Sequence, residues 1–243
     1  MKASFLFVLL CFSGFTFSQV ILSDYPVDQF YYKGGNTALQ KDLSKAFKEL
    51  ELKPCDNTME TYNISILIEK DSSIKFIKDM DSVNVEKNKC AFDVAREIIP
   101  ELKSWQPAEI QGQKFQSIVK ILINPFQIAY STGEGYGDNV VHAQMLSDAD
   151  YLHVQLKKIF QKTFRLNMEQ TIYLSFTVTK EGLMKDFVLD GNYDKIEVSR
   201  IITDLKHLKL KWKPATFNGV PMDSKQRINV NQLYNYGELY NHD

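Results

Sequence analysis

The stretch Trp105-Gln106-Pro107-Ala108-Glu109-Ile110-Gln111-Gly112 is followed later by Trp212-Lys213-Pro214-Ala215-Thr216-Phe217-Asn218-Gly219. A shift of 107 residues aligns the two stretches without a gap, since 212 − 105 = 107. Over the twenty residues that begin at Trp105, the shift gives seven identities, at Trp105, Pro107, Ala108, Gly112, Ser117, Ile121 and Asn124. A repeat of this kind indicates that the chain contains the same supersecondary unit twice.

The residues before the first copy predict a helix, a hairpin and a second helix. A helix over 38–52 rests on apolar residues at helical spacing, with Asn36 or Thr37 as its cap. A half-buried strand over 62–68 rests on the alternation of Tyr62, Ile64, Ile66 and Ile68 with other side chains. We expect a turn at Asp71-Ser72, a weaker strand over 74–80, and a helix over 91–102 whose last turn Pro100 disrupts. The repeated phrase is expected to be a loop that leads into a strand over 117–124.

The same order precedes the second copy. Ser147 to Asp150 is similar to a capping box, and the helix after it has an apolar stripe of Leu152, Leu156, Ile159 and Phe160. A strand follows, in which Ile172, Leu174, Phe176 and Val178 alternate with other residues, and Glu181-Gly182 makes its turn. Val198, Ile201, Ile202 and Leu205 predict the second helix, and 225–231 the last strand.

The fold class is therefore predicted as α+β, with two tandem α-β-β-α-β modules. Each module is expected to pack a three-stranded, mostly antiparallel sheet on two helices. The modules span 30–124 and 148–233, and a Tyr-rich tail occupies 234–243. The segment 125–147 between them contains Ser131-Thr-Gly-Glu-Gly-Tyr-Gly-Asp-Asn139, which is typical of a linker.

This pattern resembles the C-terminal domain of TonB. The resemblance rests on the element order, the Lys180-Glu181-Gly182 hairpin, the W-x-P-A-x-x-x-G phrase and the Gly-Gly lead-in within Tyr32–Leu43. Both copies lack the family's Ser-x-x-x-x-Leu-Asp-x-x-Ala stretch, and the second copy lacks the Gly-Gly lead-in. The seven prolines are scattered and form no periplasm-crossing spacer. The resemblance therefore implies the module, and not the energy-transducing machine.

Within the phrase, Trp105, Pro107 and Gly112, and likewise Trp212, Pro214 and Gly219, are interpreted as a structural motif. The indole would close a small core, its N–H would need one partner, proline would favour an extended approach, and glycine would allow a turn. The alternative is that one of the two tryptophans contacts a ligand.

The N-terminus predicts export. Met1-Lys2, an apolar run over 5–15, and small residues before Gln19 indicate a cleaved signal peptide over 1–18 and a periplasmic or secreted protein. The alternative is an uncleaved anchor, and no other run is long enough to span a bilayer. Leu9 and Leu10 before Cys11 disfavour a lipid-attachment site.

Cleavage would leave two cysteines, Cys55 and Cys90, and an even number in an exported protein favours a disulfide. Cys55 precedes the predicted hairpin and Cys90 follows it, so both are expected at the same end of the sheet. The alternative is a pair of buried free thiols.

The sequence predicts no catalytic, cofactor-binding or metal-binding residues. None of the four histidines, His142, His153, His207 and His242, is spaced like a metal pair. No serine lies in a Gly-x-Ser-x-Gly context, and Gly133–Gly137 lacks the P-loop lysine. Asp190–Ile201 lacks the glycine and the glutamate of a calcium loop. A net charge of −1 gives no reason to expect nucleic acid as a partner.

We therefore expect a non-enzymatic, exported protein-binding protein of the cell envelope. It would take up an extended partner segment at an open strand edge, at Val119–Asn124 (Val119, Ile121, Ile123) or at Gln226–Asn231 (Ile228, Val230). The other module, the tail or a second copy in a homodimer would equally cover such an edge. The alternative functions are a membrane-anchored TonB-like transducer that contacts an outer-membrane transporter, an enzyme of unseen type, and an envelope assembly module.

Overall fold

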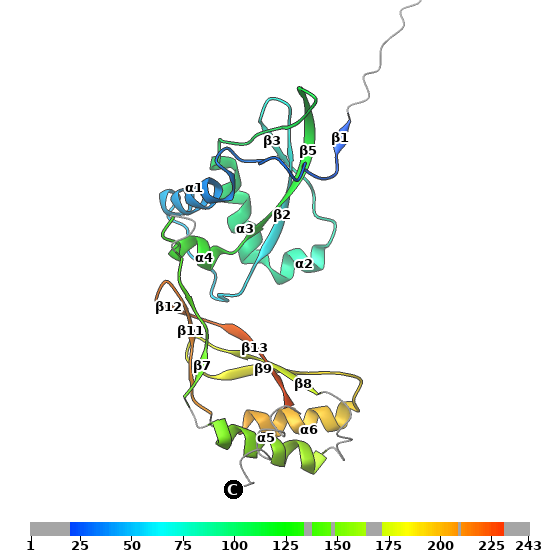
Figure 1. The fold of residues 1–243 in the computed structure, drawn as a ribbon, viewed down its shortest axis with the longest axis vertical. Helices are drawn as coiled ribbons and strands as arrows, with labels where there is room; N and C mark the ends of the chain where they lie inside the picture. The colour runs from blue at the N-terminus through cyan, green and yellow to red at the C-terminus, as the bar shows by residue number, and fades with distance from the viewer. Residues whose placement is uncertain (1–19, 134–137, 147–148, 164–171, 209, 231–243) are drawn as a thin grey trace, which may run out of the picture.

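The computed structural model describes residues 20–133, 138–146, 149–163, 172–208 and 210–230 (Figure 1). This part of the chain is a mixed α+β protein with six α-helices and mostly antiparallel sheets. We refer to residues 20–133 as the first half and to residues 138–230 as the second half. In chain order the elements are β1 (Ile21–Leu22), α1 (Gly35–Glu49), β2 (Tyr62–Ile68), β3 (Ile74–Phe76), α2 (Ser82–Lys87), α3 (Lys89–Ile98), η1 (Ile99–Glu101), β4 (Ala108–Ile110), β5 (Gln113–Ile123), α4 (Pro125–Tyr130), β6 (Val140–Val141), β7 (Gln144–Met145), α5 (Ala149–Thr163), β8 (Tyr173–Val178), β9 (Met184–Asp190), α6 (Lys195–Lys206), β10 (Trp212–Lys213), β11 (Ala215–Phe217), β12 (Val220–Met222) and β13 (Ser224–Asn229).

The sheet of the first half has the strand order β1-β5-β2-β3. β2 is antiparallel to both β5 and β3, whereas β1 is parallel to β5. The alternating burial of β2 confirms the prediction, because its four inward residues, Tyr62, Ile64, Ile66 and Ile68, are all buried. They pack against the apolar faces of α1 and α3, which lie together on one side of the sheet (Figure 1).

The sheet of the second half has the order β13-β8-β9, and β8 is antiparallel to both neighbours. Helices α5 and α6 lie side by side below this sheet (Figure 1). The predicted apolar residues of the two helices and of β8 form one buried cluster, which contains Leu152, Leu156, Ile159, Phe160, Ile172, Leu174, Phe176, Val178, Ile201 and Leu205. The order β13-β8-β9 repeats β5-β2-β3, so these three strands follow the same order in the two halves.

Several predicted boundaries need correction. Helix α1 begins at Gly35 after Gly34, whose φ of 87° is left-handed, so neither Asn36 nor Thr37 is the cap. β3 ends at Phe76 and not at Met80, and the sequence prediction missed α2, whose first turn is capped by the Asp81 side chain. The disruption by Pro100 is confirmed, because α3 ends at Ile98 and a 3₁₀ turn follows.

The segment 125–147 is not a bare linker. Asn124 caps helix α4 by accepting a 3.0 Å hydrogen bond from the Gln127 N–H, and Phe126 and Ile128 are buried. Further on, β6 pairs with β11, and β7 pairs with β10. Because Ser131–Asn139 is rich in glycine, the sequence predicted a linker and missed the elements on either side of it.

The repeated phrase is not a plain loop either, because each copy contains a hairpin. In the first copy β4 pairs with the start of β5, and in the second β11 pairs with β12. The turn residues Gln111 and Gly112 have φ of 53° and 77°, and Asn218 and Gly219 have 49° and 81°. Positive φ at both central residues is the type I′ pattern of two-residue hairpins, so the predicted role of the two glycines is confirmed.

The predicted signal peptide 1–18, the residues Ser147 and Asp148 of the predicted capping box, and the tail 234–243 lie outside the described residues. Within the described ranges, none of the helices has the length and apolar character needed to cross a membrane.

Candidate binding edges

Successive residues of β5 direct their main-chain N–H and C=O groups alternately toward β2 and away from the sheet. The Ile77 N–H donates a 3.0 Å hydrogen bond to the Ser65 carbonyl. The main-chain N–H and C=O groups of the odd-numbered residues of β2 are therefore directed toward β3. The even-numbered residues of β2 therefore point toward β5, where Ile64 lies opposite Ile121. It follows that Val119, Ile121 and Ile123 bond to β2, and that the outward groups of β5 belong to Lys120 and its even-numbered neighbours.

The same argument applies to β13. The Val230 N–H donates a 2.8 Å hydrogen bond to the Ile172 carbonyl, so Val230 and Ile228 point their main chain toward β8. The outward N–H groups of this strand are those of Lys225, Arg227 and Asn229.

The predicted edge residues are thus on the correct strands, but their side chains lie in the core. Val119, Ile121, Ile123 and Val230 are at most 4% exposed, and Ile228 is partly buried. An added strand would meet the main chain next to these residues and not their side chains. The sequence prediction chose these edges for their apolar residues. In the structure those residues mark the face of the sheet that packs against the core.

The two edges differ in what covers them. On the outer side of β5, β1 lies parallel to the strand at Gln116 and Ser117. On the outer side of β13, no strand of the described part of the chain pairs with Lys225–Asn229. No described strand pairs with the outer side of β5 from Ile118 to Ile123 either, so each half has an uncovered edge that follows a covered start.

The start of the β13 edge is covered by a residue of the first half. The Asp223 N–H donates a 2.8 Å hydrogen bond to Oγ1 of Thr58, and both residues are buried. Under the shift of 107 residues, Asp223 corresponds to Gln116, which β1 covers in the first half. The repeat alignment would have pointed to Asp223, but no sequence signal marks Thr58.

The Asp223 carboxylate links the edge to the turn between β8 and β9. Its Oδ1 accepts a 2.8 Å hydrogen bond from the Lys180 N–H, and its Oδ2 lies 2.9 Å from Nζ of Lys185. The hydrogen bond to Asp223 raises the pKa of Lys185 above its ordinary value. In the first half, Gln116, which corresponds to Asp223, donates a hydrogen bond to Glu69, and Glu69 forms an ion pair with Lys75.

A second contact between the halves involves the type I′ turn of β11 and β12. Nδ2 of Asn218 donates to the Tyr130 carbonyl and to Oδ1 of Asp138, both at 2.8 Å. Asp138 also accepts from the Ser131 hydroxyl and the Thr132 N–H, each at 2.9 Å. Burial opposes ionisation of Asp138, but these donors outweigh burial and hold its pKa below the ordinary value.

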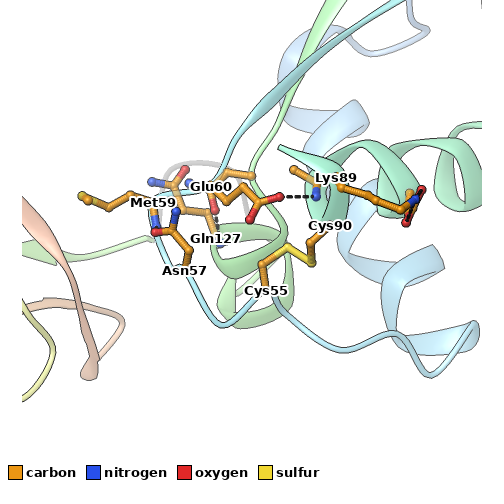
Figure 2. The surroundings of a disulfide bond; sticks show 10 residues. Cys55, Asn57, Met59, Glu60, Lys89, Cys90 and Gln127 are labelled. Atoms are coloured by element: carbon orange, nitrogen blue, oxygen red, sulfur yellow. Dashed lines mark hydrogen bonds and ion pairs between the residues drawn. A yellow bond between two sulfur atoms is a disulfide. The ribbon is translucent and has the colours of Figure 1, made fainter. Parts of the chain in front are cut away.

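The predicted disulfide between Cys55 and Cys90 is present, with a Cα–Cα distance of 5.9 Å. Figure 2 shows that it joins the loop before β2 to the first turn of α3. Across this junction, Glu60 Oε1 accepts a 2.9 Å hydrogen bond from the Ala91 N–H (Figure 2). The disulfide therefore fixes the loop that carries Thr58. Both sulfur atoms are bonded to each other, so neither is available as a thiolate ligand for a metal near Glu60.

The two tryptophans of the phrase occupy matching places. Trp105 is 4% exposed and packs edge-to-face on Tyr32, with centroids 5.0 Å apart. Trp212 packs on Phe176, with centroids 5.6 Å apart. The expectation that each indole N–H needs one partner is wrong within the described residues, where neither Nε1 has one. Pro107 and Pro214 lie between each tryptophan and its hairpin, as a structural motif requires.

Comparison of the chain with protein-family models, with curated proteins and with solved structures finds no match.

Proposed function

We propose that this chain is a non-enzymatic, exported binding protein that takes up an extended segment of a protein partner at the outer edge of β13. In this proposal its two halves are tandem modules of the TonB C-terminal type. One observation carries it. No strand of the described part of the chain pairs with the outer edge of β13 from Lys225 to Ile228, whereas β1 already lies against part of the outer edge of β5, at Gln116 and Ser117.

β1 is an example of the binding mode within the chain itself. Ile21 and Leu22 lie parallel to β5, opposite Gln116 and Ser117, although β1 is far from β5 in sequence. An extended segment that reached β13 would find the outward N–H groups of Lys225 and Arg227. Main-chain hydrogen bonds would supply affinity, and neighbouring side chains would supply selectivity.

The side chains at this edge are ordered before any partner binds. The Arg227 guanidinium lies 2.9 Å from Asp190 Oδ2 and 4.0 Å from the centroid of the Tyr173 ring. This arrangement spans β13, β8 and β9, so it stiffens the sheet across its width. A stiff edge loses less conformational entropy when a strand is added.

The test is selection of a phage-displayed random-peptide library against the whole protein, followed by binding assays with two substitutions at one position. Arg227→Ala removes the side chain and keeps the outward N–H, whereas Arg227→Pro removes both and leaves the ladder to β8 intact. We expect selected peptides to bind Arg227→Ala and to lose binding to Arg227→Pro. Equal binding to both variants would contradict the edge assignment.

The export part of the proposal has its own test. Intact-mass and N-terminal peptide measurements on protein from soluble and membrane fractions should find a soluble chain that begins at or near Gln19. A chain that keeps Met1 and stays in the membrane fraction would instead support the anchored, transducer-like role.

A further inference from the structure

The opposite edge of the first sheet has a gap. β3 pairs only with Ile66–Ile68, and one further bond joins Ile77 to Ser65. The chain then leaves the sheet toward α2 (Figure 1). On this side, no strand of the described part of the chain lies opposite Asn63. Because odd-numbered residues of β2 point their main chain this way, the N–H and C=O of Asn63 face the gap.

In the second half, the equivalent place beside β8 is occupied by the strand β9. When the buried residues of β2 and β8 are aligned, Asn63 corresponds to Tyr173 and Ser65 to Ser175. There β9 continues, so that Asp190 lies opposite Tyr173 and Val188 lies opposite Ser175. The first half therefore lacks the counterpart of Val188–Asp190 and has a strand-sized vacancy in its place.

The vacancy opens into a groove of about 930 Å³ between β2, α2 and α3. The residues that matter for binding are Tyr62, Asn63, Phe76, Met80, Val85 and Arg96. Met80 is 83% exposed, which is high for a large apolar side chain. A groove that offers both apolar and charged side chains beside an unpaired strand edge suits an extended peptide in which apolar and charged residues alternate.

The groove is lined by three cationic side chains, Lys78, Arg96 and Lys120, and by three carboxylates, Asp79, Asp81 and Glu86. The Arg96 guanidinium stacks on the Phe76 ring, 3.8 Å from its centroid, and no carboxylate of the described residues forms an ion pair with it. Two of the three lining carboxylates are already engaged. Asp79 accepts hydrogen bonds from the Tyr62 hydroxyl and the Asp81 N–H, and Asp81 accepts one from the Asn84 N–H. A stacked guanidinium with free donors favours a carboxylate on the ligand.

We propose that this groove binds an extended peptide that pairs with the main chain of Asn63, packs apolar side chains against Phe76, and places a carboxylate on Arg96. The proposal goes beyond the function proposed above, because it uses the β2 edge and not the β13 edge. The chain's own β9 shows the kind of sequence that fits. In β9, Phe187 and Leu189 are buried, and Asp186 and Asp190 flank them.

The probe is therefore a fluorescein-labelled peptide with the sequence Lys-Asp-Phe-Val-Leu-Asp-Gly, which is that of Lys185–Gly191. We expect it to bind the whole protein with a Kd below about 1 mM. In ¹⁵N spectra the amides of Asn63 and Ser65 should shift. Arg96→Ala should weaken binding about tenfold, since one charge-assisted hydrogen bond is lost. Arg200→Ala, at an exposed arginine on α6, is the matched control and should bind as the wild type does.

A second peptide, in which both aspartates are replaced by asparagine, keeps the test decisive if Arg96→Ala fails to fold. It should bind the wild-type protein about tenfold more weakly than the acidic peptide, and the two peptides should bind Arg96→Ala equally. Three results would overturn the inference: no binding at 1 mM, shifts confined to β13, or equal affinity of both peptides for the wild-type protein. Shifts confined to β13 would support the β13 proposal instead, and the other two results have no bearing on whether β13 binds a partner.

Discussion

The main-chain N–H of Asp223 donates a 2.8 Å hydrogen bond to the hydroxyl oxygen of Thr58, a residue 165 positions earlier in the chain. Because Asp223 immediately precedes β13, this contact marks the end of the covered part of its outer edge. The Thr58 loop is itself fixed to α3 by the disulfide and by Glu60. The first half therefore determines where the uncovered edge of the second half begins.

Replacing Thr58 by valine should lower the free energy of unfolding by about 1–2 kcal/mol, because the buried Asp223 N–H would lose its acceptor without a change in side-chain size. Urea unfolding gives the energy, and the hydrogen-exchange rate of the Asp223 amide should rise. Thr203→Val is the control, since it removes only the exposed hydrogen bond from Thr203 to the Ser199 carbonyl. Unchanged stability together with an unchanged Asp223 exchange rate would show that this contact does not join the halves.

The disulfide should contribute about 4 kcal/mol to stability, as the chain-entropy relation gives for a sequence separation of 35. The double variant Cys55→Ala/Cys90→Ala is expected to unfold at lower urea, and its Asp223 amide is expected to exchange faster because the Thr58 loop is released. Labelling of the denatured, unreduced wild-type protein should find neither Cys55 nor Cys90 as a free thiol. Finding both would refute the bond.

Gly182 should tolerate alanine less well than Gly112 does. Both have positive φ, 80° and 77°, so each alanine incurs roughly 1–2 kcal/mol of backbone strain. A Cβ at Gly182 would in addition lie 2.3 Å from the Trp212 carbonyl oxygen, whereas a Cβ at Gly112 meets nothing within 4 Å. Gly182→Ala should therefore lose at least about 1 kcal/mol more than Gly112→Ala in urea unfolding. Equal losses would mean that the turn can move away from Trp212.

Stability should fall at alkaline pH through Tyr62. Burial, followed by the hydrogen bond to Asp79, raises the pKa of Tyr62 to about 12, above the ordinary value of 10.0. The folded protein then holds this proton more tightly than the unfolded chain, so the stabilisation is complete below pH 10 and is lost as the pH rises toward 12. The free-energy difference between the wild type and Tyr62→Phe should accordingly shrink over this window. A difference that stays constant from pH 8 to pH 12 would exclude the raised pKa.

The sequence was sufficient for the elements whose burial follows a strict period. Ile64, Ile66 and Ile68 alternate along β2, and Leu152, Leu156 and Phe160 recur along α5, because one face of each element packs against a core. The Cys55–Cys90 pairing also followed from chain order, since a hairpin brings its two ends together.

Other features depend on contacts that periodicity does not contain. The short elements β6 and β7 exist because β11 and β10 pair with them, and the phrase becomes a hairpin because two residues in each copy adopt positive φ. The largest omission from the sequence prediction was the orientation of the main-chain N–H and C=O groups along the edge strands. The apolar residues Ile121 and Ile228 identified the correct strands, but the outward main-chain groups belong to neighbours such as Lys120 and Arg227.

The most direct test of the central claim is amide hydrogen exchange along β13 in the free, full-length protein. If its outer edge is open, the amides of Lys225 and Arg227 should exchange quickly, while those of Gln226, Ile228 and Val230, which face β8, should be protected. This alternation needs no knowledge of the partner. Equal protection of all five amides would show that the edge is already covered, and would contradict the proposal that it receives a partner strand.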